Sequence, residues 1–253
     1  MKNLLITVFL ITCFTVLGQE AKDTQVIVRT KAKDAKFIGT SMGGSMIIIR
    51  DALTNEILAK GLTKGGTGNT EAIMKTPKER YTDIHSGAAF FETSLRLSAP
   101  LLATIEAIAP VNHESRVMTS TQVWLIPGKH MGEQGIVLEI PGFVIDGLYP
   151  QTHQGFSLAN DKTIEVKANL VMMCGCTISP NGLWDGNQLE VEAHIYVNGA
   201  YWKTEKMKNS ADNTFTFDLE LEKTGSHEVV ITAFDPLSKN TGADELNFRV
   251  SNE

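Results

Sequence analysis

The sequence predicts an all-β protein built from two tandem β-sandwich domains. Short apolar runs with a period of two recur along the chain, and glycine, proline and asparagine residues separate them. Only residues 70–75 have the pattern of a short helix, and Pro77 follows them as a stop. Regularly spaced strands with such turns are typical of sandwiches. The first domain is expected at 24–149 and the second at 160–253, with the polar, turn-rich stretch from Tyr149-Pro150 through Asn160-Asp161 as a linker.

The N-terminus has the pattern of a secretory signal peptide. Lys2 is charged, residues 4–17 are apolar, and the run is too short to span a bilayer. We expect a signal peptide at 1–18 with cleavage after Gly18, and therefore a periplasmic or extracellular protein. A lipoprotein anchored at Cys13 is the less favoured alternative, because Thr12 stands where glycine, alanine or serine is usual. No later run is apolar enough to be a transmembrane segment.

The composition indicates a folded, mildly acidic protein. Hydrophobic residues make up 42% of the chain, which is enough for a packed core. The formal net charge is -6, and no lysine or arginine cluster alternates with aromatic residues, so nucleic acid is not expected as a partner. Of the 3 cysteines, those at 174 and 176 remain after cleavage, too few for a disulfide-dense scaffold.

The first domain is expected to consist of short strands and turns. Residues 46–50 form an apolar run, 51–55 are turn-like, and 57–59 return as the second strand of a hairpin. Glycines at 65–68 indicate a loop. Further strands are expected at 25–29, 88–97, 101–109, 117–126, 136–140 and 143–145, with Pro141-Gly142 as a turn between the last two.

Catalytic motifs are weak in this sequence. Gly39-Thr40-Ser41-Met42 resembles the serine motif of subtilisin-like proteases, which opens a helix in that family. Here a strand pattern follows at 46–49, and the mature chain before Ser41 is too short for the aspartate and histidine motifs that the family places upstream. No nucleophile–base pair or pair of carboxylates emerges elsewhere, so we do not expect an enzyme.

The second domain shows the clearest alternation. Every second residue from 164 to 174 is apolar, which predicts a strand with one buried face. The apolar residues are Ile164, Val166, Ala168, Leu170, Met172 and Cys174. Further strands are expected at 191–197, 200–202, 215–221, 225–235 and 245–250, and Asn198-Gly199 is a hairpin turn between the first two of these.

The last part of the chain resembles a known domain family. Residues 225–235 read Gly-Ser-His-Glu-Val-Val-Ile-Thr-Ala-Phe-Asp, which is similar to the penultimate strand of bacterial immunoglobulin-like domains. The resemblance covers residues 160–253 and implies an immunoglobulin-like sandwich, a fold that serves many roles. Antibody-type domains bridge their two sheets with a disulfide, but Ala233 or a neighbour stands where the second cysteine would be. Cys174 is therefore left with Cys176 as its partner.

Three interpretations of the sulfur-rich segment 172–176 stay open. Strand residues two apart have Cα atoms about 6.6 Å apart, near the roughly 6.8 Å limit for a disulfide, so a Cys174–Cys176 bond needs a kink that Gly175 permits. Such a bond would be easily reduced, which allows a redox role. As free side chains, Met172, Cys174 and Cys176 would offer soft ligands that suit copper as Cu(I). A purely structural role, with methionine and cysteine filling the core, is the third.

Trp184 and Asp185 lie in a loop rich in glycine and asparagine. An aromatic side chain on a loop at the end of a sandwich suits stacking on a sugar or on a protein partner. It equally suits folding back as a lid on the core.

These observations favour a secreted or periplasmic, non-catalytic binding or accessory protein. The first hypothesis is a soft metal ion held by the Met-x-Cys-x-Cys cluster. The alternative is a carbohydrate- or protein-binding surface module that uses the Trp184 loop, with a cell-surface glycan or protein as partner and the cysteines purely structural.

Overall fold

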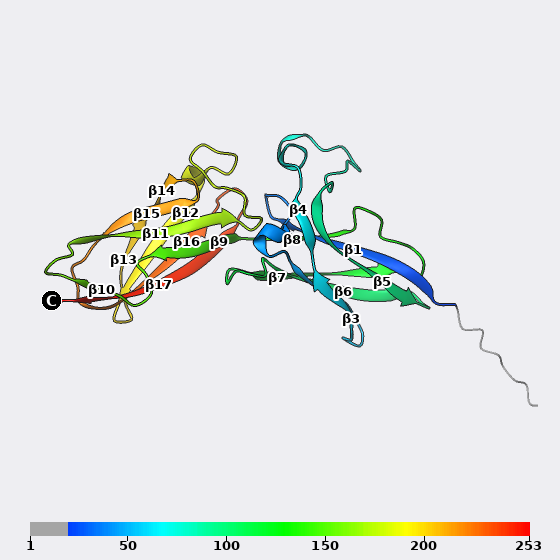
Figure 1. Cartoon of the computed structure of the whole chain (residues 1–253), viewed down its shortest axis with the longest axis horizontal. Coiled ribbons are helices and arrows are strands. Elements are labelled where there is room, and N and C mark those ends of the chain that lie inside the picture. The colour runs from blue at the N-terminus through cyan, green and yellow to red at the C-terminus, as the bar shows by residue number, and fades with distance from the viewer. Residues whose placement is uncertain (1–19) are drawn as a thin grey trace, which may run out of the picture.

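The computed structural model describes residues 20–253, and nearly all of its regular structure is β. The strands form two lobes that follow one another along the longest axis of the molecule (Figure 1). The predicted all-β sandwich class is confirmed. The predicted signal peptide at 1–18, with Cys13, lies outside the described residues. No helix among residues 20–253 is long and apolar enough to cross a membrane.

The first lobe is a sandwich of two four-stranded sheets. In the first sheet the strand order is β4 (Lys64–Thr67), β5 (Ala88–Leu97), β1 (Lys22–Ala32) and β8 (Ile136–Ile140). In the second it is β3 (Ile57–Leu62), β2 (Met46–Asp51), β6 (Leu101–Ala109) and β7 (Val117–Leu125). β5 is antiparallel to the first part of β1, and β8 is parallel to its last part.

The second lobe packs a five-stranded sheet on a four-stranded one. The larger sheet has the order β10 (Gln154–Ser157), β17 (Thr241–Ser251), β16 (Gly225–Phe234), β12 (Glu190–Val197) and β13 (Ala200–Lys206). The smaller has the order β14 (Lys208–Ala211), β15 (Thr214–Glu220), β11 (Thr163–Met172) and β9 (Phe143–Tyr149).

Alternation along the central strands builds the core. Val26 and Val28 of β1 are fully buried, as are Val229 and Ile231 of β16. Burying each such side chain contributes roughly 1.5–3 kcal/mol. Buried residues of both lobes belong to one hydrophobic cluster. The core therefore continues through the junction of the two sandwiches.

One predicted strand pairs in a different sandwich from the expected one. The sequence predicts a strand at 143–145 in the first domain, with Pro141-Gly142 between it and the strand at 136–140, but β9 pairs with β11 in the second sandwich. The Pro-Gly pair carries the chain across the junction instead of reversing it. Gly142 has φ +108, and a Cβ there would lie 2.9 Å from Met173 Cε and 3.0 Å from the carbonyl oxygen of Thr241. This crossing therefore requires glycine.

The turns were predicted better than the shortest strands. The hairpin turns at 51–55 and 198–199 join β2 to β3 and β12 to β13. Residues Glu71–Lys75 form a single π-helical turn, η2, where a short helix was expected. The short strands β4, β10 and β14 were missed, and β10 falls inside the expected linker. Each lies at the edge of its sheet, where one-sided pairing imposes little alternation.

Candidate functional site at the domain junction

The chain reverses sharply at the sulfur-rich segment. β11 ends at Met172, whose backbone N–H donates to the carbonyl oxygen of Cys176 at 3.2 Å. The N–H of Gly175 donates to the carbonyl oxygen of Met172 at 2.7 Å, and Gly175 has φ +74. The strand predicted to run through Cys174 thus stops two residues earlier, because glycine adopts the left-handed backbone that closes this turn.

Cys174 and Cys176 are joined by a disulfide across the turn, with Cα atoms 5.4 Å apart. Met172 is buried and lines a separate small cavity, whereas both cysteines line an open groove. No group of three His, Cys, Asp or Glu side chains within residues 20–253 could hold a metal ion. A disulfide sulfur is not a thiolate ligand. The copper hypothesis therefore stays a prediction about the reduced chain.

The disulfide turn packs directly on the first sandwich. Met42 lies in the 3₁₀ turn η1 (Thr40–Met42), which follows β1. A Cβ at Gly175 would lie 2.5 Å from the sulfur of Met42. Glycine at 175 therefore serves two purposes: it closes the turn, and it lets the thioether of Met42 approach the backbone.

Trp184 is the second contact between the sandwiches. Its indole N–H donates to the main-chain oxygen of Asp34 at 2.8 Å, and its ring packs against the hydrophobic core. Of the two orientations considered for this side chain, the structure shows the one folded back on the core. The ring is only half-buried and keeps an open side along the groove.

Asp185 holds the Trp184 loop in shape. Its carboxylate accepts hydrogen bonds from the backbone N–H of Asn181 at 2.8 Å and of Asn187 at 3.0 Å. These bonds, the one from Asn187 first, lower the pKa of Asp185. The side chain is thus engaged within its own loop and positions Trp184.

Asn240 forms the third contact and was not predicted. Its side chain is fully buried, accepts from the N–H of Gly142 at 2.8 Å, and donates to the main-chain oxygen of Lys33 at 3.1 Å. It therefore joins the crossover and the first sandwich to the turn before β17. Asn240 lies between the strands expected at 225–235 and 245–250, and an asparagine in such a turn usually bonds to nearby backbone, so its long-range role leaves no signal in the sequence.

Three aspartates line the small cavity of about 90 Å³ behind Trp184, namely Asp34, Asp185 and Asp235. Desolvation raises the pKa of Asp34, and the charge of Asp235 raises it further. The junction thus places two like charges near each other, beside the indole ring.

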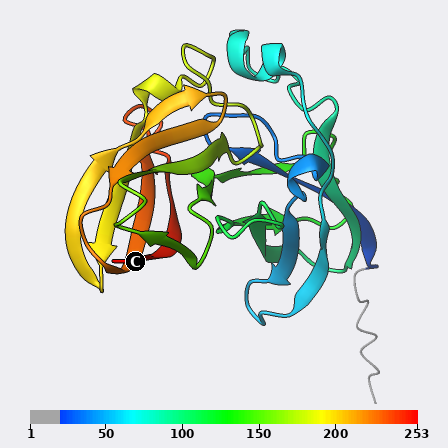
Figure 2. The ribbon, with the colours of Figure 1, turned by 60° about the vertical axis from the view of Figure 1, so that its left-hand side comes forward.

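An open groove of about 560 Å³ lies along the junction. The first sandwich lines it with Lys36, Ser41, Thr67, Thr70 and Lys75, and the second with residues 174–177, Leu183 and Trp184. The Trp184 loop and the segment carrying η2 rise on the same side of the molecule (Figure 2). The groove therefore combines an indole ring with hydroxyls and two amines contributed by both lobes.

Comparisons with known proteins identify no family. No protein-family model matches the chain, and no curated protein matches it significantly. The fibronectin(III)-like modules of Clostridium thermocellum CbhA are similar over 90% of this chain and 95% of theirs, at 9% identity and a TM-score of 0.28. Dimeric latent PorU of Porphyromonas gingivalis is similar over 91% of this chain but 24% of its own, at 10% identity and a TM-score of 0.30. Similarities with such low TM-scores do not establish a shared fold. The fold assignment therefore rests on the strand order and pairing of the sheets themselves.

Proposed function

We propose that the protein is an exported, non-catalytic binding protein that holds a cell-surface glycan chain in the junction groove. One observation supports this proposal most strongly. Both sandwiches line the groove, and the indole ring of Trp184, held by its hydrogen bond to Asp34, forms part of its wall. A groove shaped before the ligand arrives binds with a smaller loss of conformational entropy.

The chemistry of the groove suits a neutral or weakly acidic sugar chain. The half-buried ring of Trp184 offers an apolar face, and hydroxyls of Ser41, Thr67 and Thr70 offer donors and acceptors. Lys75 is 3.2 Å from Glu71, so its charge is partly compensated. The groove is thus lined by hydroxyls, amines and an indole, groups that can contact the hydroxyls and the apolar face of a sugar ring.

Binding of the mature chain to an array of bacterial surface polysaccharides tests this function. Trp184→Ala should weaken binding to the best-bound polysaccharide at least tenfold. Trp124→Ala is the matched control, because Trp124 is 59% exposed on β7 and should leave binding unchanged. Equal binding by the Trp184→Ala variant, or binding only to unfolded peptides on a parallel peptide array, would contradict the glycan proposal.

A further inference from the structure

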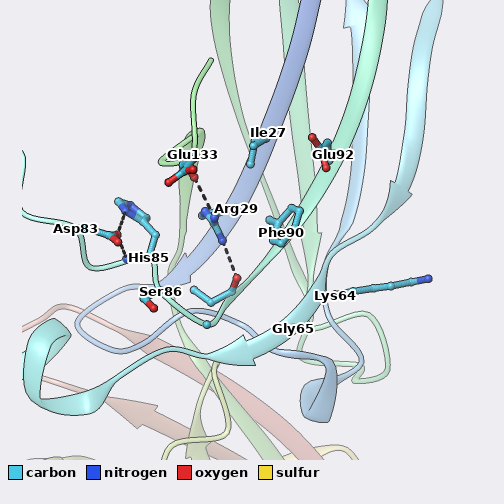
Figure 3. Close-up of a pocket in the computed structure, with 12 residues that line it drawn as sticks. Ile27, Arg29, Lys64, Gly65, Asp83, His85, Ser86, Phe90, Glu92 and Glu133 are labelled. Carbon is cyan, nitrogen blue, oxygen red and sulfur yellow. Dashed lines mark hydrogen bonds and ion pairs between the residues drawn. The ribbon is translucent and has the colours of Figure 1, made fainter. Parts of the chain in front are cut away.

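A second cavity, of about 460 Å³, lies on the outer face of the sheet that contains β1. Val26 and Val28 of β1 point into the core, so Ile27 and Arg29 point to the opposite face. That face would be open to solvent, but the segment before β5, which carries Asp83 and His85, and the segment before β8, which carries Glu133, lie beside it (Figure 3). Arg29 is consequently only 7% exposed. Arg29 therefore points away from the core and forms the base of the cavity.

The guanidinium of Arg29 is held entirely by neutral groups. Its Nη1 donates to the carbonyl oxygen of Ala88 at 2.6 Å, and its Nη2 donates to that of Glu133 at 3.0 Å. The ring of Phe90 lies 5.0 Å from its central carbon. Figure 3 shows the guanidinium between the two segments, with Phe90 beside it on the neighbouring strand. The arginine is therefore fixed in place with its charge uncompensated by these partners.

Among residues 20–253 no carboxylate lies within ion-pair distance of Arg29. Burial lowers the pKa of Arg29, and the charge of Asp83 in the same cavity raises it against that lowering. The Nε of Arg29 is buried and has no hydrogen-bond partner among those residues. Burying a charge without a compensating partner is unfavourable, and so is leaving a buried N–H unpaired. An acceptor with a negative charge would remove both costs.

His85 supplies a second polar group to the same cavity. Its Nδ1 is buried without a hydrogen-bond partner in the described structure, although Asp83 Oδ1 lies 3.3 Å away. Burial, and then the charge of Arg29, lower the pKa of His85. The imidazole is therefore neutral at physiological pH and does not compete with Arg29 for an anion.

The other side chains of the cavity limit the charge of an incoming ligand. Three carboxylates line the cavity, those of Asp83, Glu92 and Glu133. Glu92 accepts a hydrogen bond from Gln25, and Asp83 accepts one from the backbone N–H of His85 at 2.7 Å. Their charges would repel a phosphate or sulfate dianion more strongly than a monoanion. Ile27 and Phe90 add apolar surface beside the guanidinium.

We propose that this cavity binds a ligand with one carboxylate next to an apolar group, and that Arg29 is its anchor. A carboxylate supplies a negative charge at ion-pair distance from the guanidinium, and its two oxygens accept from the N–H groups of Arg29. The apolar group then covers Ile27 and Phe90. Either a free organic acid or the C-terminal carboxylate of a peptide carries this chemistry. The site is separate from the junction groove, so it goes beyond the proposed glycan binding.

Calorimetric titration of the full mature chain tests the site. The probes are phenylacetate and hexanoate, their primary amides, inorganic phosphate, and short peptides ending in phenylalanine with a free or an amidated C-terminus. Each free carboxylate that binds should do so at least tenfold more tightly than its amide and than phosphate. Tighter binding by the peptides identifies a chain end as the source, and tighter binding by the small acids identifies a metabolite.

Two variants separate the anchor from general electrostatics. Arg29→Lys keeps the charge but loses the planar fork, and should weaken carboxylate binding at least tenfold. Lys64→Gln removes a charge from the rim, where Lys64 points away from Arg29 (Figure 3), and should change binding less than twofold. The comparison of acid with amide needs no variant, so it holds even if Arg29→Lys fails to fold. Equal affinity for acid and amide, tighter binding of phosphate, or no binding of any carboxylate at 10 mM would overturn the proposal.

Discussion

The indole N–H of Trp184 donates to the main-chain oxygen of Asp34, 150 positions earlier, at 2.8 Å. This bond ties a loop of the second sandwich to the turn that follows β1. Asn240 makes a parallel bond to the neighbouring Lys33, and Met42 packs on the disulfide turn at Gly175. The residues that the sequence marked for binding thus lie where the two sandwiches meet.

Replacing Trp184 with phenylalanine should weaken the junction modestly. The change removes one hydrogen bond and keeps an aromatic ring, so the free energy of unfolding should fall by about 1 kcal/mol. Urea unfolding measures this change. Trp124→Phe on exposed β7 should leave the free energy unchanged, and an equal effect of both substitutions would show that the Asp34 bond contributes nothing specific.

Asn240→Ala should be more damaging. The substitution leaves the N–H of Gly142 and the carbonyl oxygen of Lys33 without their partner in a buried place, and each such loss costs about 1–3 kcal/mol. We expect the free energy of unfolding to fall by roughly 2–4 kcal/mol in the same assay. Asn247→Ala is the control, because the exposed side chain of Asn247 donates only to Glu245 Oε1 among residues 20–253. A loss no larger than in this control would contradict the role given to Asn240.

His227 should make the protein less stable in mild acid. It is fully buried, stacks on Phe248 at 5.0 Å, and its Nε2 has no partner among residues 20–253. Burial is the largest cause that lowers the pKa of His227. The folded state therefore binds a proton less readily than the unfolded chain, whose histidine pKa is about 6.5. Stability is fully present above pH 6.5 and is lost as the pH falls from there towards the lowered pKa.

Thermal unfolding between pH 7.5 and 5 measures this effect. His227→Phe should flatten the pH dependence, with a residual slope from His85, whose pKa is also lowered. Parallel curves for the wild type and the variant would mean that His227 does not titrate on unfolding.

The oxidised chain should bind no stoichiometric copper. Cys174 and Cys176 form a disulfide, so thiol titration of residues 19–253, unfolded and without reductant, should find no free thiol. After reduction, the two thiolates become available and Cu(I) binding is expected, with loss of that binding in a Cys174→Ser, Cys176→Ser variant. Elemental analysis follows the metal. Two free thiols in the untreated protein would contradict the disulfide.

The regular strands were predictable because apolar and polar residues alternate along a strand that has one buried face. Predicted strands at 88–97, 101–109 and 136–140 match β5, β6 and β8 to the residue. Local turn chemistry also succeeded at Asn198-Gly199. Both features depend on neighbours in sequence, which a single chain displays directly.

The junction was not predictable in the same way. The partner of Asn240 depends on how two sandwiches meet, and the turn at Gly175 depends on a positive φ that a glycine permits but does not impose. The alternation along β1 places Arg29 on the outer face of the sheet. Its burial arises from two loop segments, distant in sequence, that cover this face. Such long-range contacts leave no periodicity in the sequence.

The central claim is that Trp184, Asn240 and the disulfide turn hold the two sandwiches in one fixed arrangement that shapes the groove. Residual dipolar couplings of backbone amides test this most directly. One alignment tensor should fit the couplings of both sandwiches in the wild type, and Asn240→Ala should require two. Two different tensors in the wild-type protein would show that the sandwiches move independently, and would contradict the account.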